Sequence, residues 1–185
     1  NYRLTGETIN YGAFSKTVGY AYDAKGNMLS LSYPGGFTRS YTYNDCDLLI
    51  EVDDPMGGIT EFLRDSAGNV IKVLYPNGDT LLQDHDGEDN LVAQFLVDNG
   101  GDTVSEYVYG YDQAGNILPI FHNQLSEATF SYNNDNQLNH ATYQFPSATP
   151  PYQHDLLYTY DAAGNRSTLT DIDLASGPTN HLYYY

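Results

Sequence analysis

A short phrase recurs in this sequence and constrains its fold more than any other feature. The phrase is Tyr-x-Tyr-Asp-x-x-Gly-Asn, and it stands in full at residues 20–27, 109–116 and 158–165. Such repetition is typical of an array of similar units, each of which buries its apolar face only against its neighbours. We therefore expect function to lie in the surface of the array and not in one catalytic cluster.

Weaker copies of the phrase fill the intervals. Marking each copy by its Asp or Asn gives positions 23, 44, 65, 84, 112, 133 and 161, and hence steps of 21, 21, 19, 28, 21 and 28. The period is therefore 21 residues with insertions. The two longest steps contain stretches rich in Gly, Pro and polar residues, which predicts loop insertions near residues 94–104 and 140–155.

Each unit contains two turn signals. In the first, Asp accepts hydrogen bonds from backbone N–H groups ahead of it and Gly supplies a positive φ. This predicts structural turns at Asp23 with Gly26, Asp65 with Gly68, Asp112 with Gly115, and Asp161 with Gly164. In the second signal, Pro34, Pro55 or Pro76 presets φ.

Two turns of about four residues leave two strands of about six residues in each unit, so one unit is one β-hairpin. The sequence therefore predicts an all-β fold, an antiparallel meander of about seven hairpins with about fourteen strands. Because a sheet of this size twists, we expect it to coil into part of a spiral shell or a solenoid-like sheet.

Tyrosine is unusually frequent, with 19 residues against 7 Phe and no Trp. Alternation along the expected strands places tyrosines on one face, where cross-strand aromatic pairs contribute about 0.5–1 kcal/mol each. We predict an aromatic ladder made of Tyr20, Tyr22, Tyr41, Tyr43, Tyr109, Tyr111, Tyr158 and Tyr160. The alternative use of exposed tyrosines is to stack on sugar rings.

The charge of the chain excludes several classes of partner. Seven basic and 24 acidic residues give a formal net charge of -17. This charge repels nucleic acid and anionic membranes, so neither is an expected partner. No run of about 18 apolar residues is present, and membrane insertion is not expected either.

No pattern in the sequence points to catalysis. The densest acidic stretch, residues 84–90, lacks the spacing of an EF-hand loop, and Ca²⁺ binding at the acidic turns stays open. The five histidines have no spacing typical of metal ligands, and the single Cys46 cannot form an internal disulfide. We therefore predict no enzyme activity, no catalytic residue, no metal site and no cofactor.

The full phrase, followed by Leu and then by a Pro turn, resembles the YD repeat of the rearrangement-hotspot (RHS) family. That resemblance covers roughly residues 15–185. It implies a long β-sheet wound into a hollow shell, as in bacterial RHS toxins, the BC component of Tc toxin complexes and the teneurin receptors. In the toxins the shell encloses a C-terminal effector, and in teneurins it supports adhesion between cells.

One further motif of the family has a partial counterpart in this sequence. RHS toxin shells end in an Asp-Pro-x-Gly-Leu cleavage signature. Residues 54–57 resemble part of it, but Gly58 stands where Leu is expected. We interpret this segment as an ordinary repeat turn.

We expect residues 1–185 to be a single repeat array and a segment of a longer, secreted or surface-exposed protein. Its expected role is a non-enzymatic piece of shell wall that encapsulates or displays an effector. Its expected partners are further repeats of the same chain or identical copies joined through sheet edges, with an enclosed effector or a surface receptor or glycan. The alternative is a subunit of an extracellular filament, or an adhesion or carbohydrate-binding module.

Overall fold

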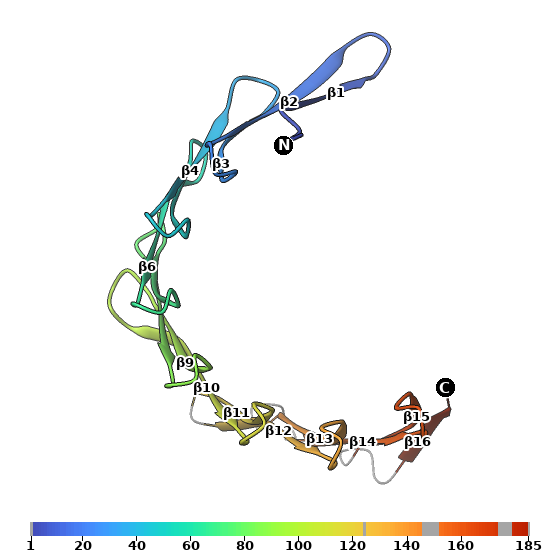
Figure 1. Cartoon of the computed structure of the whole chain (residues 1–185). Coiled ribbons are helices and arrows are strands. Elements are labelled where there is room, and N and C mark those ends of the chain that lie inside the picture. Colours follow the sequence, from blue (N-terminus) through green and yellow to red (C-terminus); the bar gives the residue numbers. More distant parts are fainter. Residues whose placement is uncertain (1, 124, 146–151, 174–178, 185) are drawn as a thin grey trace. The chain divides into compact units, whose positions relative to one another are not determined.

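The computed structural model describes residues 2–123, 125–145, 152–173 and 179–184. Within these ranges the chain forms β-strands joined by tight turns and no helix (Figure 1). The strands form a 16-stranded sheet whose order follows the chain from β1 to β16. The prediction of an all-β antiparallel meander of hairpins is confirmed, with sixteen strands in the described ranges where about fourteen were expected.

The strands are five to nine residues long. Their bounds are β1 Gly6–Asn10, β2 Ser15–Tyr22, β3 Met28–Ser32, β4 Thr38–Tyr43, β5 Leu49–Asp54, β6 Gly58–Arg64, β7 Val70–Leu74 and β8 Thr80–His85, followed by β9 Leu91–Val97, β10 Thr103–Tyr111, β11 Ile117–His122, β12 Leu125–Tyr132, β13 Leu138–Phe145, β14 Tyr152–Tyr160, β15 Arg166–Asp173 and β16 Thr179–Tyr184.

Contacts group the residues into two compact units. Unit 1 consists of Asn1–Leu82 with Leu96–Asp102, and unit 2 of Gln83–Phe95 with Thr103–Tyr185. Each unit has its own rows of cross-strand pairs, and the two are described separately below.

In unit 1 one face of the sheet is apolar and aromatic. Side chains directly opposite each other in an antiparallel pair share a face. The register pairs Tyr20 with Leu31, Tyr41 with Val52, Phe62 with Val73, and Val73 with Leu81. We call the face that carries these residues the tyrosine face of unit 1. On the opposite face the pairs are mostly polar, as in Ser30 with Ser40, Thr42 with Glu51, and Glu51 with Glu61.

Unit 2 repeats this division. Its tyrosine face carries Tyr109 paired with Ile120, Ile120 with Ala128, Phe130 with Ala141, Ala141 with Leu156, and Tyr158 with Leu169. The opposite face carries Thr129 paired with Thr142, Thr142 with Asp155, and Thr159 with Thr168. Alternation along each strand therefore separates apolar from polar side chains in both units.

No second layer formed by the described residues covers the tyrosine faces. Among the described apolar residues only Val73, Ala128 and Ala141 are buried, and most ring-bearing side chains on these faces are half-buried. The accessible surface is 11976 Å², whereas a compact monomer of this mass exposes roughly 8,900 Å². Stability therefore comes from neighbours within the sheet, because a layered core is missing from the described part of the chain.

The structure corrects the predicted loop insertions. Residues 94–104 are not a loop, because β9 and β10 extend to Val97 and from Thr103, leaving a tight turn between Asp98 and Asp102. The extra residues lengthen both strands, which keeps their backbone groups hydrogen bonded. In the second stretch, β13 and β14 extend to Phe145 and from Tyr152, and residues 146–151 lie outside the described residues.

Candidate functional site

The most regular feature of the surface is a series of five-residue turns that we call the Asp turns. They begin at Asp23, Asn44, Asp65, Asp86, Asp112, Asn133 and Asp161. In each, the N–H of the first residue donates to the carbonyl oxygen of the fifth at 2.9 to 3.0 Å. The register of the two flanking strands shifts next to the turn, as it does between Ala21 and Tyr22. Such a shift is expected of a type I turn closed by a left-handed residue and a bulge.

The first side chain of each Asp turn holds the loop together from inside. Asp161 Oδ1 accepts hydrogen bonds from the N–H groups of Ala163 and Asn165, both at 2.9 Å. Its other oxygen, Oδ2, accepts one from the side-chain amide of Asn165 at 3.2 Å. These donors, the N–H of Asn165 first, hold the pKa of Asp161 below its ordinary value. The Asn at the end of the phrase thus clamps the Asp at its centre.

The fourth position of the Asp turn has a left-handed backbone. Gly26, Gly68, Gly115 and Gly164 occupy it with φ between +82° and +111°. In the remaining turns, Asp47, Asp89 and Asn136 adopt φ of 62°, 64° and 58°. These side chains are the ones that tolerate this conformation best after glycine.

The copy of the phrase that was marked at position 84 is wrong, because the turn does not begin there. Asp84 lies in β8, and the turn begins two residues later, with the N–H of Asp86 bonded to the carbonyl oxygen of Asn90 at 3.0 Å. The Asp-x-x-Gly spacing was matched by chance, whereas the Asn four residues after Asp86 is the partner that closes the loop. With Asp86 as the mark, the step from Asp65 becomes 21 residues.

A substitution at the left-handed position tests this geometry. Gly115 has φ of +82° and no atom within 4 Å of the place that a Cβ would take. We expect Gly115→Val to destabilise the protein by about 1–2 kcal/mol through backbone strain alone. Gly115→Asn, which copies the residue found at position 136, should cost less than half as much. Chemical denaturation of both variants measures the difference, and equal losses would contradict a left-handed turn.

Hydroxyl groups of the second tyrosine in the phrase link one Asp turn to the turn before it. Tyr43, Tyr111, Tyr132 and Tyr160 donate to the carbonyl oxygens of Met28, Leu91, Ile117 and Leu138, at 2.7 to 3.1 Å. Each acceptor is the first strand residue after the preceding turn. At the matching position Arg64 Nε donates to the carbonyl oxygen of Leu49 at 3.2 Å. Burial raises the pKa of Tyr111 and keeps its hydroxyl a donor.

The two tyrosines of one phrase give a matched pair of variants. We expect Tyr111→Phe to cost about 1 kcal/mol, because it removes the hydroxyl and leaves the carbonyl of Leu91 without this donor. Tyr109→Phe, two residues away, should stay within about 0.5 kcal/mol, since the ring remains on the tyrosine face. Urea denaturation separates the two variants. A larger loss for Tyr109→Phe would show that the hydroxyl of Tyr111 does not join the turns.

Adjacent Asp turns also contact each other through their side chains. In unit 1, Asp47 Oδ1 accepts from Asn27 Nδ2 and Lys25 Nζ, each at 2.9 Å. In unit 2, Asn116 Nδ2 donates to Asn136 Oδ1 at 3.2 Å, and Gln137 Nε2 to the carbonyl oxygen of Gly164 at 3.3 Å. The hydrogen bond from Lys25 lowers the pKa of Asp47. The Asp turns are therefore bonded into rows.

The eight tyrosines predicted as an aromatic ladder lie at strand positions next to the Asp turns, on β2, β4, β10 and β14. Of these eight, Tyr109 has a ring contact, with Tyr107, which also stacks on His122, and elsewhere on the tyrosine face Phe130 contacts Tyr143. Arg3 and Arg166 lie over the rings of Tyr22 and Tyr158. The structure thus adds hydroxyl and cation contacts to the ring pairs expected from the sequence, and a stabilising ladder stays a prediction.

Sequence reasoning missed a cluster of polar side chains in unit 2. Ser105 Oγ lies 3.3 Å from His122 Nε2, and His122 Nδ1 lies 3.7 Å from Glu127 Oε1. The order Ser, His, acid is that of a nucleophilic triad, but the acid is too far for a hydrogen bond, and the imidazole stacks on Tyr107. Two other histidines lie near acids, His154 at 3.1 Å from Asp171 and His140 at 3.6 Å from Asp155. Only the strand register could have revealed these pairs.

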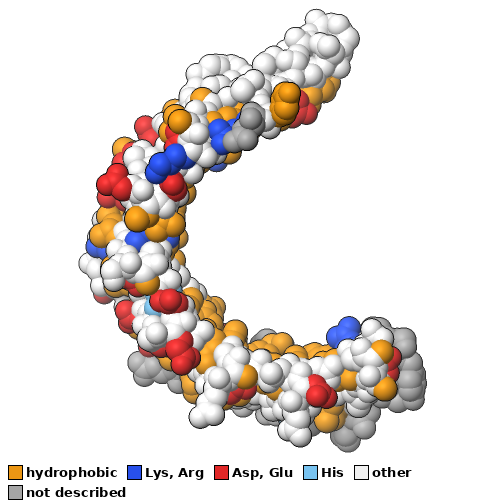
Figure 2. All heavy atoms as spheres, in the orientation of Figure 1, with side chains coloured by type: hydrophobic (Ala, Val, Ile, Leu, Met, Phe, Trp, Pro, Cys, Tyr) orange, Lys and Arg blue, Asp and Glu red, His pale blue; other side chains and the backbone are white. Residues whose placement is uncertain are grey.

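Acidic side chains are scattered over much of the visible surface, with few basic ones (Figure 2). In the described ranges, no group of three or more His, Cys, Asp or Glu side chains is arranged to hold a metal ion. Cys46 is exposed in an Asp turn. The same part of the chain has no helix that is long and apolar enough to span a bilayer.

Comparison with known proteins connects these features to a family. Residues 22–58 match the family model described as RHS Repeat. No curated protein matches the chain. The Photorhabdus luminescens Tc holotoxin pore matches with a TM-score of 0.74 and 16% identity, over 92% of this chain and 10% of that chain.

Crystal structures of TcdB2-TccC3 and of TcdB2-TccC3-Cdc42 match over the same shares, with a TM-score of 0.74 and 18% identity. At this identity the likeness shows a shared fold, and the chain spans 10% of the length of the solved chains that it matches. The RHS Repeat match at residues 22–58 and the fold shared with the Tc toxin chains both support the resemblance of this chain to the RHS/YD-repeat family.

Proposed function

We propose that residues 1–185 are one repeat array that forms part of the wall of a hollow shell, within a longer chain. The observation that carries this proposal is the uncovered tyrosine face of each unit. Half-buried aromatic and aliphatic side chains lie on one face and Ser, Thr and Glu on the other. A sheet with this division suits a boundary between water and an enclosed space.

The relatives support a structural role. The Tc toxin structures contain chains about ten times as long as this one, with the same fold over its length. By analogy, the partners of this segment are further YD repeats, and the enclosed molecule is an effector polypeptide. A secreted or surface location follows from the same analogy, and so does the absence of enzyme activity from the segment itself.

Sequencing the gene on both sides of this segment tests the array. We expect further Tyr-x-Tyr-Asp-x-x-Gly phrases at steps near 21 residues. Unrelated sequence on both sides would contradict a wall, because a few hairpins cannot close around a cavity.

The strongest chemical alternative is tested at Ser105. A fluorophosphonate probe labels serine nucleophiles that a histidine activates. We expect no labelling of the native chain. Labelling that is lost in Ser105→Ala and in His122→Gln, and kept in Ser131→Ala, would establish a hydrolase and overturn the non-enzymatic role.

An open sheet edge favours assembly into a filament as the second candidate. All five residues of β1 are exposed, and the stacked rings of Tyr11 and Phe14, with centroids 5.1 Å apart, lie at the end of the first hairpin. An exposed strand edge pairs readily with another strand. Negative-stain microscopy of the purified 185-residue chain decides: uniform fibres would support the filament, and monodisperse particles would count against it.

A further inference from the structure

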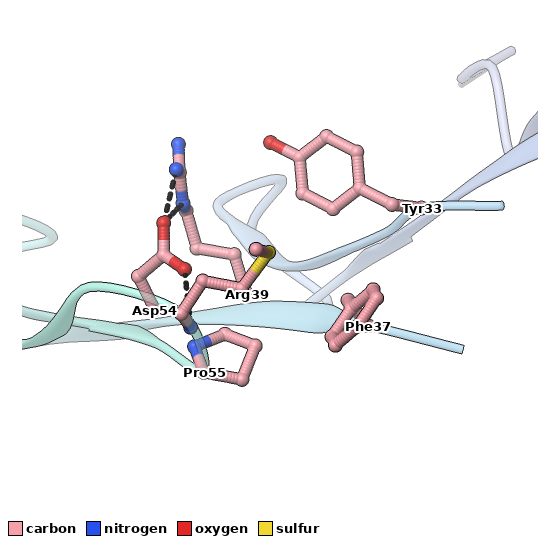
Figure 3. A pocket seen from close by; sticks show the side chains of 6 residues that line it. Tyr33, Phe37, Arg39, Asp54 and Pro55 are labelled. Atoms are coloured by element: carbon pink, nitrogen blue, oxygen red, sulfur yellow. Dashed lines mark hydrogen bonds and ion pairs between the residues drawn. The ribbon is translucent and has the colours of Figure 1, made fainter. Parts of the chain in front are cut away.

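A hollow of about 400 Å³ lies in unit 1 between two successive turns that contain proline. Tyr33, Phe37 and Arg39 line one side and Asp54, Pro55 and Met56 the other, as Figure 3 shows for the five labelled residues. The rings of Tyr33 and Phe37 are 37% and 47% exposed, and Met56 is 78% exposed. Three large apolar groups are thus available to a ligand.

The hollow exists because the stacking of these turns is incomplete. Along unit 1, the second residue of each of two later turns packs on a glycine of the turn before it. Pro76 lies against Gly58 and Asn99 against Gly78, each closer than a Cβ would allow. If the preceding turn were packed in the same way, Pro55 would cover a glycine of the turn at residues 33–37, but no atom lies within 4 Å of the place that a Cβ on Gly36 would take. The space between the turns at residues 33–37 and 54–58 is therefore open, whereas the next two spaces between successive turns are closed.

The charges in the hollow cancel each other. Arg39 donates through Nε, at 2.9 Å, and through Nη2 to Asp54 Oδ2. Asp54 Oδ1 accepts the N–H of Met56 at 2.9 Å, and this bond, ahead of Arg39, lowers the pKa of Asp54. An ionic ligand therefore gains little here, and the net charge of -17 further disfavours an anion.

Beside the apolar surface, the Arg39 guanidinium, which also has a hydrogen bond with the Tyr41 side chain, offers a further polar contact. The third nitrogen of the Arg39 guanidinium is turned away from Asp54 (Figure 3). Since guanidinium carries five N–H groups, it can still donate to a neutral acceptor such as a peptide carbonyl. Aromatic rings, arginine and an adaptable methionine are also the side chains most typical of surfaces that bind polypeptides.

We propose that this hollow binds an extended polypeptide segment, taking one bulky apolar side chain between Tyr33, Phe37 and Met56 while Arg39 donates to the segment's backbone carbonyl. The volume suits a single aromatic side chain with its neighbouring peptide groups. Arg39 lies on the tyrosine face, directly opposite Leu31. The inference rests on the proposed function, since it names what the tyrosine face of the wall contacts.

Nuclear magnetic resonance of the isotope-labelled 185-residue chain tests the site. The probe is the peptide acetyl-Gly-Ser-Gly-Phe-Gly-Ser-Gly-amide, and its control carries Ser in place of Phe. We expect the Phe peptide to shift the signals of residues 33–39 and 54–57 saturably, with a dissociation constant below about 10 mM. Phe37→Ser and Met56→Ser should each weaken binding at least about tenfold.

Two control variants keep the outcomes separate. Ile59→Ser removes an apolar side chain that is 47% exposed on the opposite face, and should change binding less than about twofold. Met56→Leu conserves apolar bulk and should retain binding. The sugar chitotriose serves as a carbohydrate probe. The proposal would be overturned if the Ser peptide bound as well as the Phe peptide, or if chitotriose bound and the Phe peptide did not. It would also be overturned if the Phe peptide shifted no signal at the highest concentration.

The site and the wall can fail independently. Absence of peptide binding, in a full-length protein that forms hollow particles, would remove the site and leave the wall. Peptide binding by a protein that forms no closed particle would keep the site and remove the wall.

Discussion

Ala141→Asp should unfold unit 2 more than any other single exchange considered for this chain. Ala141 is completely buried, and its cross-strand partners on the tyrosine face are Phe130 and Leu156. The rings of Phe130 and Tyr143 meet edge to face above this row, with centroids 6.0 Å apart. A carboxylate here would be desolvated, and His154, an imidazole on the same face, already bonds Asp171 at 3.1 Å.

The expected loss is about 3 kcal/mol or more, which lowers Tm by roughly 6–12 °C in a chain of this length. Ala163→Asp is the matched control, because Ala163 is exposed in an Asp turn and the same charge remains hydrated there. Differential scanning calorimetry compares the two variants. If Ala141→Asp melted with the native chain, the tyrosine face would not be a packed surface.

Acid should destabilise the protein through the Asp turns. The pKa values of Asp86, Asp112 and Asp161 lie below the ordinary 3.8 because amide groups of Asn90, Asn116 and Asn165 bond the carboxylates. A carboxyl group with a lowered folded pKa contributes stability that is complete above its unfolded pKa. That contribution disappears as the pH falls below 3.8 through the folded values. We therefore expect Tm to be level near pH 5–7 and to fall steeply below about pH 4.

Relief of self-repulsion works in the opposite direction, since protonation reduces the net charge of -17. Salt at about 0.5 M screens that repulsion and leaves short hydrogen bonds intact. The dependence of Tm on pH should therefore be measured at this salt concentration. Asn44 and Asn133 show that Asn supports the same turn, because each Oδ1 accepts two backbone N–H groups. In a variant with Asn at positions 86, 112 and 161, Tm should fall less as the pH drops below about 4. A Tm that rises steadily down to pH 2.5 in the native chain would contradict this account.

The sequence predicted the features that local chemistry decides. Asp112 and Gly115 specify a turn because both the acceptor and the left-handed residue lie within five positions. The same rule failed at Asp84, where a second Asp two residues later had the better partner in Asn90. A pattern that includes the Asn at the fifth position would have found Asp86.

Features that depend on contacts between hairpins could not be predicted. Nothing in the sequence around Tyr111 shows that its hydroxyl reaches the carbonyl of Leu91, twenty residues earlier. The pairing of Arg39 with Asp54 and the open space beside Gly36 likewise depend on how successive turns stack. The stretch 94–104 was predicted to be a loop because its Gly and Asp residues are typical of turns. In the structure most of it belongs to the longer strands β9 and β10.

Electron cryomicroscopy of the full-length protein tests the wall most directly. The proposed function predicts closed hollow particles in whose wall the strands β1 to β16 take part, with the tyrosine faces toward the enclosed space. A solid particle, an open fibre, or a sheet whose tyrosine faces lie toward bulk solvent would contradict it.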